Sequence, residues 1–508
     1  MPEGHRRLRL AELLGSLSLA TDLGTGQPMG HGMRTCLLAV ALANEMGFDA
    51  ATQQAVYQAT LLRFLGCTAD ASESSVAVGG DEIGFNRAMA LPLNGTMTEG
   101  IAATVRHVGR GDPAPRRARL VLGVLTDTDV AVEGLAAHCE VAAMLAKRLG
   151  IEERVVSALG YSYERWDGKG YPSRIAGDQI PLEIRISSIA RDIDLAAVSG
   201  WNPVELVTKR RGRGYDPDIV DAWLAMPRVI PDAEWDAFLA AEPPPHASVL
   251  DLTHALTVLA DFVDLKSAWT RGHSRRVALL ARAAAEQAGM QVEDVALVER
   301  AGLVHDLGRV GVENGIWDKP GPLSSDQWEQ VRLHPYLTHR ILSRCPPLEP
   351  LGSLAASHHE RSDGSGYHRE LKNDQVSPQA RLLAAADFLD AATSDRPHRP
   401  AMETDAAFSV LRAEAKSGRL DPDTVSWVVS AAGGELERRR DPNPDGLTDR
   451  EVEVLRLIAT GATNREVAAR LFISPKTAGR HVENIYAKIG VSSRAAAAVY
   501  AMGSGVLA

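Results

Sequence analysis

The pattern Glu-Arg-x-Asp-Gly-x-Gly-Tyr occurs twice in this chain, at residues 164–171 and again at residues 360–367. Only the second copy directly follows two imidazoles, His358 and His359, whereas Ser162 and Tyr163 precede the first. Imidazole nitrogens bind transition metals well, while a hydroxymethyl group and a phenol are poor ligands. The pattern therefore predicts a duplicated module of which only the second copy keeps its chemistry.

The repeat extends beyond this pattern. Residues 61–66 resemble residues 303–308, and a histidine lies 26 residues before the pattern in each copy, at His138 and His334. Matches at this many registered points indicate an internal duplication. The first copy has about 46 additional residues before His138, and the Gly- and Ser-containing stretch 72–80 predicts that they form a loop insertion.

Helical periodicity dominates the chain. Ala- and Leu-rich segments such as residues 273–284 repeat their apolar positions every 3.6 residues, and alternating strand patterns are scarce, so we predict an all-α protein. Prolines 243–245 and the charged stretch 438–446 interrupt this periodicity. The predicted order is a degenerate domain at 1–240, a linker at 241–255, a second domain of the same kind at 256–435, a linker at 436–446 and a small domain at 447–508.

Composition indicates a cytoplasmic protein. The hydrophobic fraction is 45%, no apolar run approaches the roughly 18 residues of a membrane span, and the first residues do not resemble a signal peptide. We therefore expect no membrane partner. The four cysteines lack CxxC spacing and are predicted to be reduced, buried thiols; they are Cys36, Cys67, Cys139 and Cys345.

Charge is unevenly spread along the chain. Residues 447–508 contain eight Lys or Arg and five Asp or Glu, a net charge of +3, which leaves −13 for the rest of a chain whose net charge is −10. A basic tail on an acidic body suggests a nucleic-acid-binding appendage.

The second copy collects five histidines and two aspartates at motif positions. They exceed the needs of one tetrahedral site and suit two metals that share a bridging carboxylate. The mixed nitrogen and oxygen donors favour iron, manganese or zinc over calcium or magnesium. Two such metals can generate a hydroxide at neutral pH and hold phosphate oxygens for in-line attack. The residues are His273, His305, Asp306, His334, His358, His359 and Asp387.

Residues 256–431 resemble an HD-GYP domain, a helical phosphohydrolase of the HD superfamily. The resemblance rests on His305-Asp306-Leu-Gly308, on residues 318–324, on His334-Pro335, on residues 358–367, and on Asp387-Phe-Leu-Asp390 followed by residues 394–397. It implies that the seven residues bind two divalent transition-metal ions, iron or manganese by preference, with Asp306 bridging. It also implies hydrolysis of cyclic di-GMP or a related cyclic dinucleotide and a homodimer. The implied catalytic residues are Asp306 and Arg309, and the implied substrate-binding residues are Arg309, Asp363, Gly366, Tyr367 and Arg396.

Three positions depart from the HD-GYP pattern. Arg309 replaces a phosphate-binding lysine, keeping the charge but not the ability to donate a proton to a leaving group. His368 replaces the namesake proline, and Trp269 replaces a carboxylate that some members use as a further ligand, so two metals are expected and not three. The alternative function is a catalytically weak or inactive HD-GYP sensor domain that controls the C-terminal domain.

The first copy has lost most of these ligands. It keeps His31 and His138, but Arg63 and Arg191 stand at two predicted ligand positions, and two cations oppose metal binding. A structural or regulatory function is favoured. The sharper alternative is that Arg63 and Arg191 form a pocket for an anionic ligand.

The C-terminal tail predicts a helix-turn-helix. Thr448 and Glu451 form a capping box, and Ser474 followed by Pro475 predicts the start of a later, basic helix. Residues 447–494 resemble the LuxR-type four-helix DNA-binding domain, which implies DNA as a partner; a helical protein-interaction module is the alternative. The implied DNA contacts are Lys476, Thr477, Arg480, His481, Asn484 and Lys488.

Overall fold

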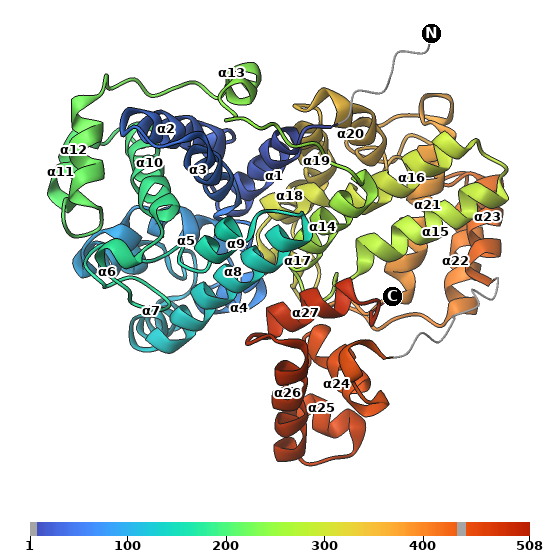
Figure 1. Cartoon of the computed structure of the whole chain (residues 1–508). Coiled ribbons are helices and arrows are strands. Elements are labelled where there is room, and N and C mark those ends of the chain that lie inside the picture. Colours follow the sequence, from blue (N-terminus) through green and yellow to red (C-terminus); the bar gives the residue numbers. More distant parts are fainter. Residues whose placement is uncertain (1–7, 434–442, 508) are drawn as a thin grey trace, which may run out of the picture. The chain divides into compact units, whose positions relative to one another are not determined.

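The structure is a computed structural model that describes residues 8–433 and 443–507 (Figure 1). Within these ranges the chain forms helices joined by turns, and its β-type pairings are isolated bridges, which confirms the all-α prediction. Of the predicted linker at 436–446, residues 436–442 lie outside the described ranges. The chain divides into two compact units, Met1–Leu252 with Glu313–Gly315, and Thr253–Val312 with Ile316–Ala508. Among the described helices, none combines the length and the apolar character that crossing a bilayer requires.

The first half of the chain is built from thirteen α-helices within the described residues. They are α1 (Leu10–Gly24), α2 (His31–Glu45), α3 (Ala50–Leu62), α4 (Ala71–Val78), α5 (Glu82–Met89), α6 (Met97–His107), α7 (Ala114–Thr126), α8 (Thr128–Arg148), α9 (Glu153–Leu159), α10 (Leu182–Val198), α11 (Pro203–Arg210), α12 (Pro217–Ala225) and α13 (Trp235–Ala240), with the 3-10 helices η1 (Pro92–Asn94) and η2 (Gly177–Gln179).

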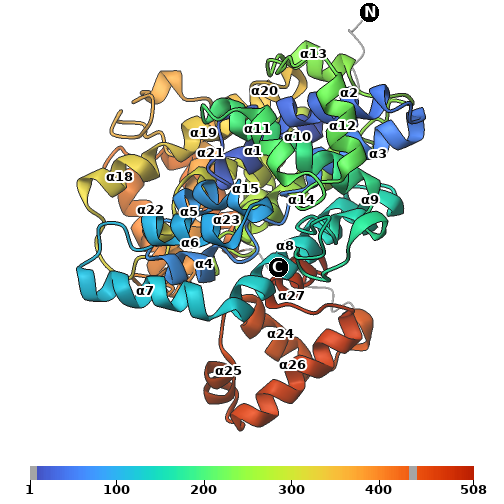
Figure 2. The ribbon, with the colours of Figure 1, turned by 90° about the vertical axis from the view of Figure 1, so that its left-hand side faces the viewer.

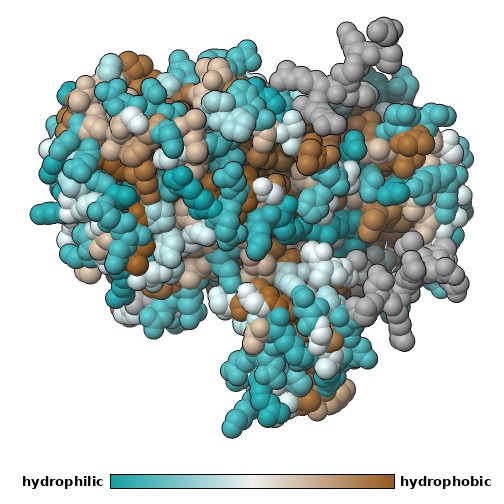
Figure 3. Space-filling model, in the orientation of Figure 1, coloured by the Kyte–Doolittle hydropathy of each residue, from teal (hydrophilic) through white to brown (hydrophobic). Residues whose placement is uncertain are grey.

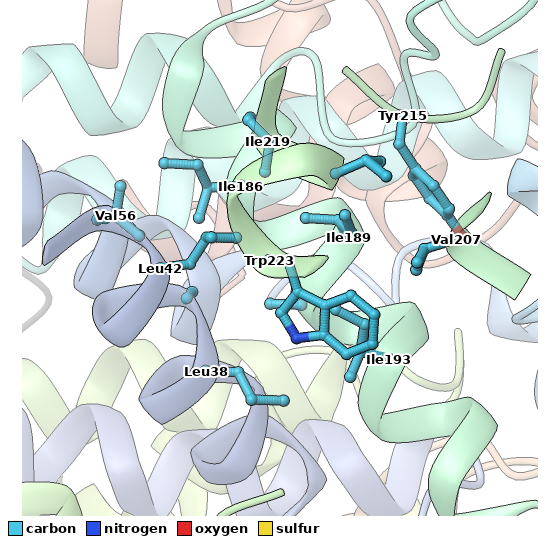
Figure 4. Packing of buried hydrophobic residues seen from close by; sticks show 14 residues of the cluster. Leu38, Leu42, Val56, Ile186, Ile189, Ile193, Val207, Tyr215, Ile219 and Trp223 are labelled. Carbon is cyan, nitrogen blue, oxygen red and sulfur yellow. The ribbon is translucent and has the colours of Figure 1, made fainter. Parts of the chain in front are cut away.

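A core cluster of this unit joins α2, α3, α10, α11 and α12. Ile186, Ile189 and Ile193 recur at helical spacing on α10 and are fully buried, so one face of that helix lies in the cluster. Figure 4 shows side chains of the cluster gathered around the Trp223 indole of α12. This packing fixes the position of α2, which begins at His31, and of α10, which carries Arg191.

The additional residues of the first copy are helical, so the prediction of a loop at 72–80 was wrong. Residues 71–78 form α4, which packs against α5 and α7. The serines in this stretch suggested a loop, yet Ser75 Oγ donates to Gly80 O at the end of the helix (3.1 Å). Gly79, with φ 92°, supplies the left-handed residue that ends α4.

The region between residues 252 and 433 contains ten further α-helices among the described residues. They are α14 (Leu252–Asp264), α15 (His273–Gln287), α16 (Val292–Val304), α17 (Asn314–Trp317), α18 (Ser325–Arg332), α19 (His334–Leu342), α20 (Glu349–Ala355), α21 (Pro378–Thr393), α22 (Thr404–Lys416) and α23 (Pro422–Gly433), with η3 (Leu307–Gly311), η4 (Pro346–Leu348) and η5 (Asn373–Gln375).

Helix α15 is central to this region and packs against α16, α21 and α23. Its buried face consists of small residues, including Ala278 and Ala281, which allows neighbouring backbones to approach closely. A Cβ atom at Gly302 of α16 would lie 2.8 Å from the Cα atom of Ala278. The close packing brings the start of α15 near the end of α16, where His273 and His305 lie with ring centroids 5.2 Å apart.

The C-terminal helices have the caps that the sequence predicts. Thr448 and Glu451 form a capping box on α24, and Ser474 accepts from the Thr477 N–H at the start of α26. Figure 2 shows these helices in a second view, and Figure 3 shows mostly hydrophilic residues on their visible face. The helices are α24 (Asp449–Ala459), α25 (Asn464–Leu471), α26 (Pro475–Ile489) and α27 (Arg494–Gly503), after η6 (Pro444–Gly446).

Candidate metal centre

Helix ends position most of the predicted metal ligands. His273 is the first residue of α15, where Gly272 provides a left-handed N-cap (φ 75°). His305 and Asp306 join the end of α16 to η3, and His334 is the first residue of α19. His358 and His359 follow α20, while Asp387 lies within α21. The structure therefore brings all seven side chains together from the starts of α15 and α19, the turns after α16 and α20, and the interior of α21.

Asp306 lies between two groups of imidazoles. Its Oδ1 atom is 3.3 Å from His334 Nε2 and 3.7 Å from His358 Nε2. Its Oδ2 atom is 3.5 Å from both His273 Nε2 and His305 Nε2. A carboxylate that faces two donor groups with its two oxygens has the arrangement expected of a bridging ligand.

The donor atoms form three overlapping groups of metal-binding size, one of which joins Asp306 with His305 and His358. The other two lie on either side of Asp306. His273, His305 and Asp387 make one group, and His334, His358 and His359 make the other; the donor atoms within each group lie within 4.8 Å of one another. Asp387 Oδ1 is 3.2 Å from His273 Nε2. The residues are nearly all buried, so a cation here would be largely shielded from solvent.

Hydrogen bonds from Nδ1 to the backbone orient three of the imidazoles so that Nε2 points into the cluster. In each, Nδ1 contacts the backbone carbonyl three residues earlier and carries the proton of that hydrogen bond, which leaves the Nε2 lone pair free to bind a metal. His305 Nε2 is buried without a hydrogen-bond partner, as expected of an atom placed for a metal. The pairs are His305 with Gly302 (2.8 Å), His334 with Val331 (2.6 Å) and His358 with Ala355 (2.6 Å).

Electrostatics also suit metal binding. Burial lowers the pKa of His334 to about 3 and that of His358 to about 4, so both imidazoles are neutral. Burial alone would raise the pKa of Asp306, but Arg309 and His305 hold it well below its ordinary value. Neutral imidazoles and ionised carboxylates are the forms that bind metals.

His273 and His305 have the opposite tendency. Burial would lower the pKa of His273, but Asp306, Asp387 and Asp390 raise it well above the ordinary value, and Asp306 and Asp387 likewise raise the pKa of His305 against the effect of burial. A cation in this group would take the place of the proton that His273 otherwise holds.

Asp390 supports His273 from behind and was not among the site residues predicted from sequence. Its Oδ2 atom is 2.7 Å from His273 Nδ1, and its Oδ1 atom accepts from Arg276 Nε at 2.6 Å. The sequence contained an indication of this role, because Asp390 follows Asp387 by three residues and therefore lies on the same side of α21.

Arg309 is held at the edge of the cluster. Its Nη1 atom lies 2.7 Å from Asp306 Oδ2, and its guanidinium lies over the Trp317 ring at 4.0 Å from the ring centroid. The Trp317 indole N–H donates to the Arg309 carbonyl at 3.3 Å. These contacts fix a permanent positive charge beside the predicted bridging carboxylate.

A cavity of about 670 Å³ opens onto the cluster, a size within the usual range of small-molecule sites. Arg309, Tyr367 and Arg396, three of the predicted substrate-binding residues, line it. Its cationic side chains favour an anionic ligand. They are Lys266, Arg309, Lys319, Arg396 and Arg399.

Two other predicted substrate-binding residues take part in loop closure, and neither lines this cavity. Asp363 Oδ1 accepts from the backbone N–H and from the hydroxyl of Ser365, at 2.9 and 2.7 Å. A Cβ atom at Gly366 would lie 2.4 Å from the Arg361 nitrogen, so glycine is needed for the loop to fold back on itself. Asp363 and Gly366 therefore have structural roles in the loop, and their part in substrate binding stays a prediction.

The first copy places arginines where the second has metal ligands. Arg63 is buried and donates to Ser188 Oγ (2.7 Å) and to the Ser162 carbonyl. Arg191 donates to Asp192 and to the Ala90 carbonyl (2.7 Å). Both guanidinium groups therefore bind acceptors of the protein, which favours a structural role over an anionic-ligand pocket. Among the described residues of this unit, no three side chains form a group of metal-binding size.

The first copy keeps the support of its first histidine. His31 Nδ1 is 2.6 Å from Asp194 Oδ2, and Arg34 Nε donates to Asp194 Oδ1 at 2.7 Å. Asp194 precedes Asp390 by the same 196 residues that separate the two octapeptides. The hydrogen bonds thus repeat those of the second copy.

Among the predicted DNA contacts on α26, Lys476, Arg480 and Asn484 are exposed, while Thr477 and His481 are half-buried. The ammonium group of Lys488 pairs with Glu451 (2.7 Å) and donates to the Gly446 carbonyl (3.1 Å). A lysine ammonium has three donors, so these two contacts are compatible with a phosphate contact, and Lys488 stays a predicted DNA contact.

Two family models match the chain. Residues 122–219 and 257–424, together more than half of the chain, match the model described as HD domain. Residues 445–501 match the model of bacterial regulatory proteins of the luxR family.

Similar proteins act on cyclic dinucleotides. The 3'3'-cGAMP-specific phosphodiesterase 3 of Vibrio cholerae serotype O1 is 29% identical over 83% of this chain and 94% of its own length. A cyclic di-GMP phosphodiesterase of Thermotoga maritima is 34% identical over 35% of this chain and 48% of its own length. The crystal structure of a cyclic GMP-AMP specific phosphodiesterase of V. cholerae superposes with a TM-score of 0.57 at 26% identity, covering 84% of this chain and 98% of that one.

Proposed function

Because this chain belongs to the HD-domain family, we propose that its second HD region hydrolyses a phosphodiester bond of a cyclic dinucleotide and that its C-terminal domain binds DNA. The observation that supports the enzymatic part best is the cluster of seven donor side chains divided by Asp306. The similar phosphodiesterases of V. cholerae and T. maritima act on 3'3'-cGAMP and cyclic di-GMP, so these two nucleotides are the proposed substrates.

The proposed cofactor is a pair of divalent transition-metal ions, iron or manganese. His273, His305 and Asp387 would hold one, His334, His358 and His359 the other, and Asp306 would contact both. Such a pair, when bound, supplies Lewis acidity toward phosphate oxygens and lowers the pKa of water.

The protein's own residues would bind and orient the phosphodiester. Arg309 lies beside Asp306 on the cavity wall, where its guanidinium can grip a phosphate oxygen. Arginine keeps its proton near neutral pH, so Arg309 balances charge and does not protonate the leaving oxygen. Burial raises the pKa of Tyr367, so its neutral hydroxyl can donate a hydrogen bond to the ligand.

We further propose that the domains follow the predicted boundaries and that residues 1–240 are a duplicated, metal-free copy. The repeated bonds of His31 with Asp194 and of His273 with Asp390 support this duplication. The protein would act in the cytoplasm as a homodimer, since helix-turn-helix proteins commonly bind two half-sites as dimers.

A crossed pair of variants tests both parts of the function. Protein loaded with Mn²⁺ or Fe²⁺ should linearise 3'3'-cGAMP or cyclic di-GMP, and Asp306→Ala should abolish turnover while leaving DNA binding intact. Arg480→Ala should do the reverse, weakening binding to a site selected from random DNA while turnover persists. Absence of wild-type turnover of both nucleotides at high enzyme concentration would contradict the enzymatic function. Equal DNA binding by wild type and Arg480→Ala would contradict the assigned recognition helix.

A further inference from the structure

Two cavities meet at the metal cluster. The cavity of about 670 Å³ has a neighbour of about 590 Å³, and both are lined by Trp328, His359, Tyr367 and Asp387. Because two predicted metal ligands belong to both linings, a ligand bound at the cluster can extend in two directions. A cyclic dinucleotide has two nucleotides to place, one on each side of the phosphate at the cluster.

Trp328 is an exposed aromatic residue on a well-anchored helix. Its side chain lies on α18 and is 46% exposed. The helix is fixed by a capping box between Ser324 and Gln327 and by Val331, which packs in a core cluster with Val312. These residues stabilise α18 and the exposed indole does not, so helix stability does not explain why a tryptophan stands at position 328.

The other tryptophans of the larger cavity differ from Trp328. Trp317 carries the Arg309 guanidinium on its ring face, so that face is already occupied. Trp269 is 40% exposed and lines only the larger cavity, and its carbonyl accepts from Arg396 Nη1 at 3.1 Å. Trp328 is thus the tryptophan placed to contact a ligand in both cavities.

We propose that Trp328 stacks on a base of the cyclic dinucleotide and divides its two nucleotide subsites, an inference that rests on the proposed function. Stacking on an aromatic ring is the common way in which proteins bind an unpaired base. The smaller cavity is lined by Arg332 and Arg361 together with Glu329 and Glu360, and Arg332 pairs with Glu329 at 2.9 Å, so Arg361 is the cation that would face the second phosphate. One nucleotide would occupy the larger cavity and the other the smaller.

The test compares Trp328→Ala and Trp328→Phe with the wild-type full-length protein, using 3'3'-cGAMP and cyclic di-GMP. Loss of one base stack should raise KM about tenfold in Trp328→Ala with kcat within about twofold, while Trp328→Phe stays within about threefold of wild-type KM. Mn²⁺ affinity, measured by calorimetry, should not change. Trp201→Ala is the matched control, because Trp201 is 53% exposed in the first unit and lines neither cavity.

The outcomes separate this inference from the proposed function. Wild-type turnover with unchanged KM in Trp328→Ala would overturn the inference alone. Reduced Mn²⁺ affinity, or equal losses in the alanine and phenylalanine variants, would show a packing role and would overturn it too. A wild type that binds nucleotide in a Trp328-dependent way without turning it over would overturn the proposed hydrolysis and support the subsite. A wild type that neither binds nor cleaves either nucleotide would overturn both.

Discussion

A buried aspartate orients the first histidine in each copy. Asp390 accepts from Arg276 and contacts His273 Nδ1, which leaves His273 Nε2 facing Asp306 and Asp387. Asp194 makes the same two kinds of contact in the first copy, where the other ligands are missing. The aspartate therefore fixes the imidazole orientation, and the metal chemistry depends on what that imidazole faces.

Asp390→Asn should weaken Mn²⁺ binding about 10- to 100-fold, because loss of the carboxylate removes the partner that orients His273 and raises its basicity. Isothermal titration with Mn²⁺ measures the change. The matched variant Asp194→Asn should leave Mn²⁺ affinity unaltered, since its histidine belongs to no group of metal-binding size among the described residues. Equal losses in the two variants would contradict the assignment of the metal to the second copy.

Ligand residues were easier to predict than their partners. The seven donors stand at fixed positions in motifs, so their identities alone suggest a metal, and the structure brings them together. The spacing of Asp390 from Asp387 places it on the same side of α21, but its contact with His273 depends on the packing of α21 against α15, which a linear sequence does not display. Asp363 and Lys488 likewise have partners that a linear sequence does not display, Ser365 and Glu451.

At the scale of elements, a glycine allows close packing at the end of the HD motif in both copies. A Cβ atom at Gly308 of η3 would lie 2.0 Å from the His334 carbonyl at the start of α19. A Cβ atom at Gly66 would lie 1.9 Å from the His138 carbonyl of α8. Any side chain at these positions must push the two backbones apart.

Gly308→Ala should destabilise the protein by roughly 1–3 kcal/mol and should also weaken Mn²⁺ binding, because the displaced segment begins with His334. Gly66→Ala should cost a similar amount of stability while Mn²⁺ affinity stays at the wild-type value. Urea denaturation and calorimetry provide the two measurements. A Gly308→Ala protein with wild-type stability and metal affinity would show that the contact relaxes without consequence.

Element prediction succeeded where caps and periodicity agreed, as at Thr448 and Ser474 in the C-terminal domain. It failed at α4, whose serines and following glycines are also typical of loops. That helix is stabilised by packing against α5 and α7, so its signal lies in tertiary contacts. Similarly, no sequence pattern marks Trp328 as shared by two cavities.

At the scale of the whole molecule, the proposed duplication gives two regions, and among the described residues only the second brings together groups of metal-binding size. The first region keeps His31 and His138 but binds its central arginine, Arg63, to internal acceptors. His138 contacts Asp70 at 2.6 Å instead of other imidazoles. We therefore expect the second region to bind a metal and the first region not to bind one.

Hydrogen exchange with and without metal should reveal this asymmetry. Mn²⁺ binds only the folded cluster, so at about 100 times its dissociation constant it stabilises that structure by about 2.7 kcal/mol. Amide exchange should slow in peptides covering the starts of α15 and α19 and the end of α16. The corresponding peptides of α2, α8 and α3 should respond much less.

Chelation with EDTA should reverse the protection, and Asp306→Asn should reduce it, since that variant weakens the carboxylate shared by the two donor groups. Equal slowing in α2, α3 and α8 would mean that the first copy also takes up metal. Because Arg63 and Arg191 add positive charge where a cation would sit, that result would require both side chains to leave their present acceptors. The exchange pattern thus tests whether the chain's two HD-type regions have separate roles, one binding metal and the other structural.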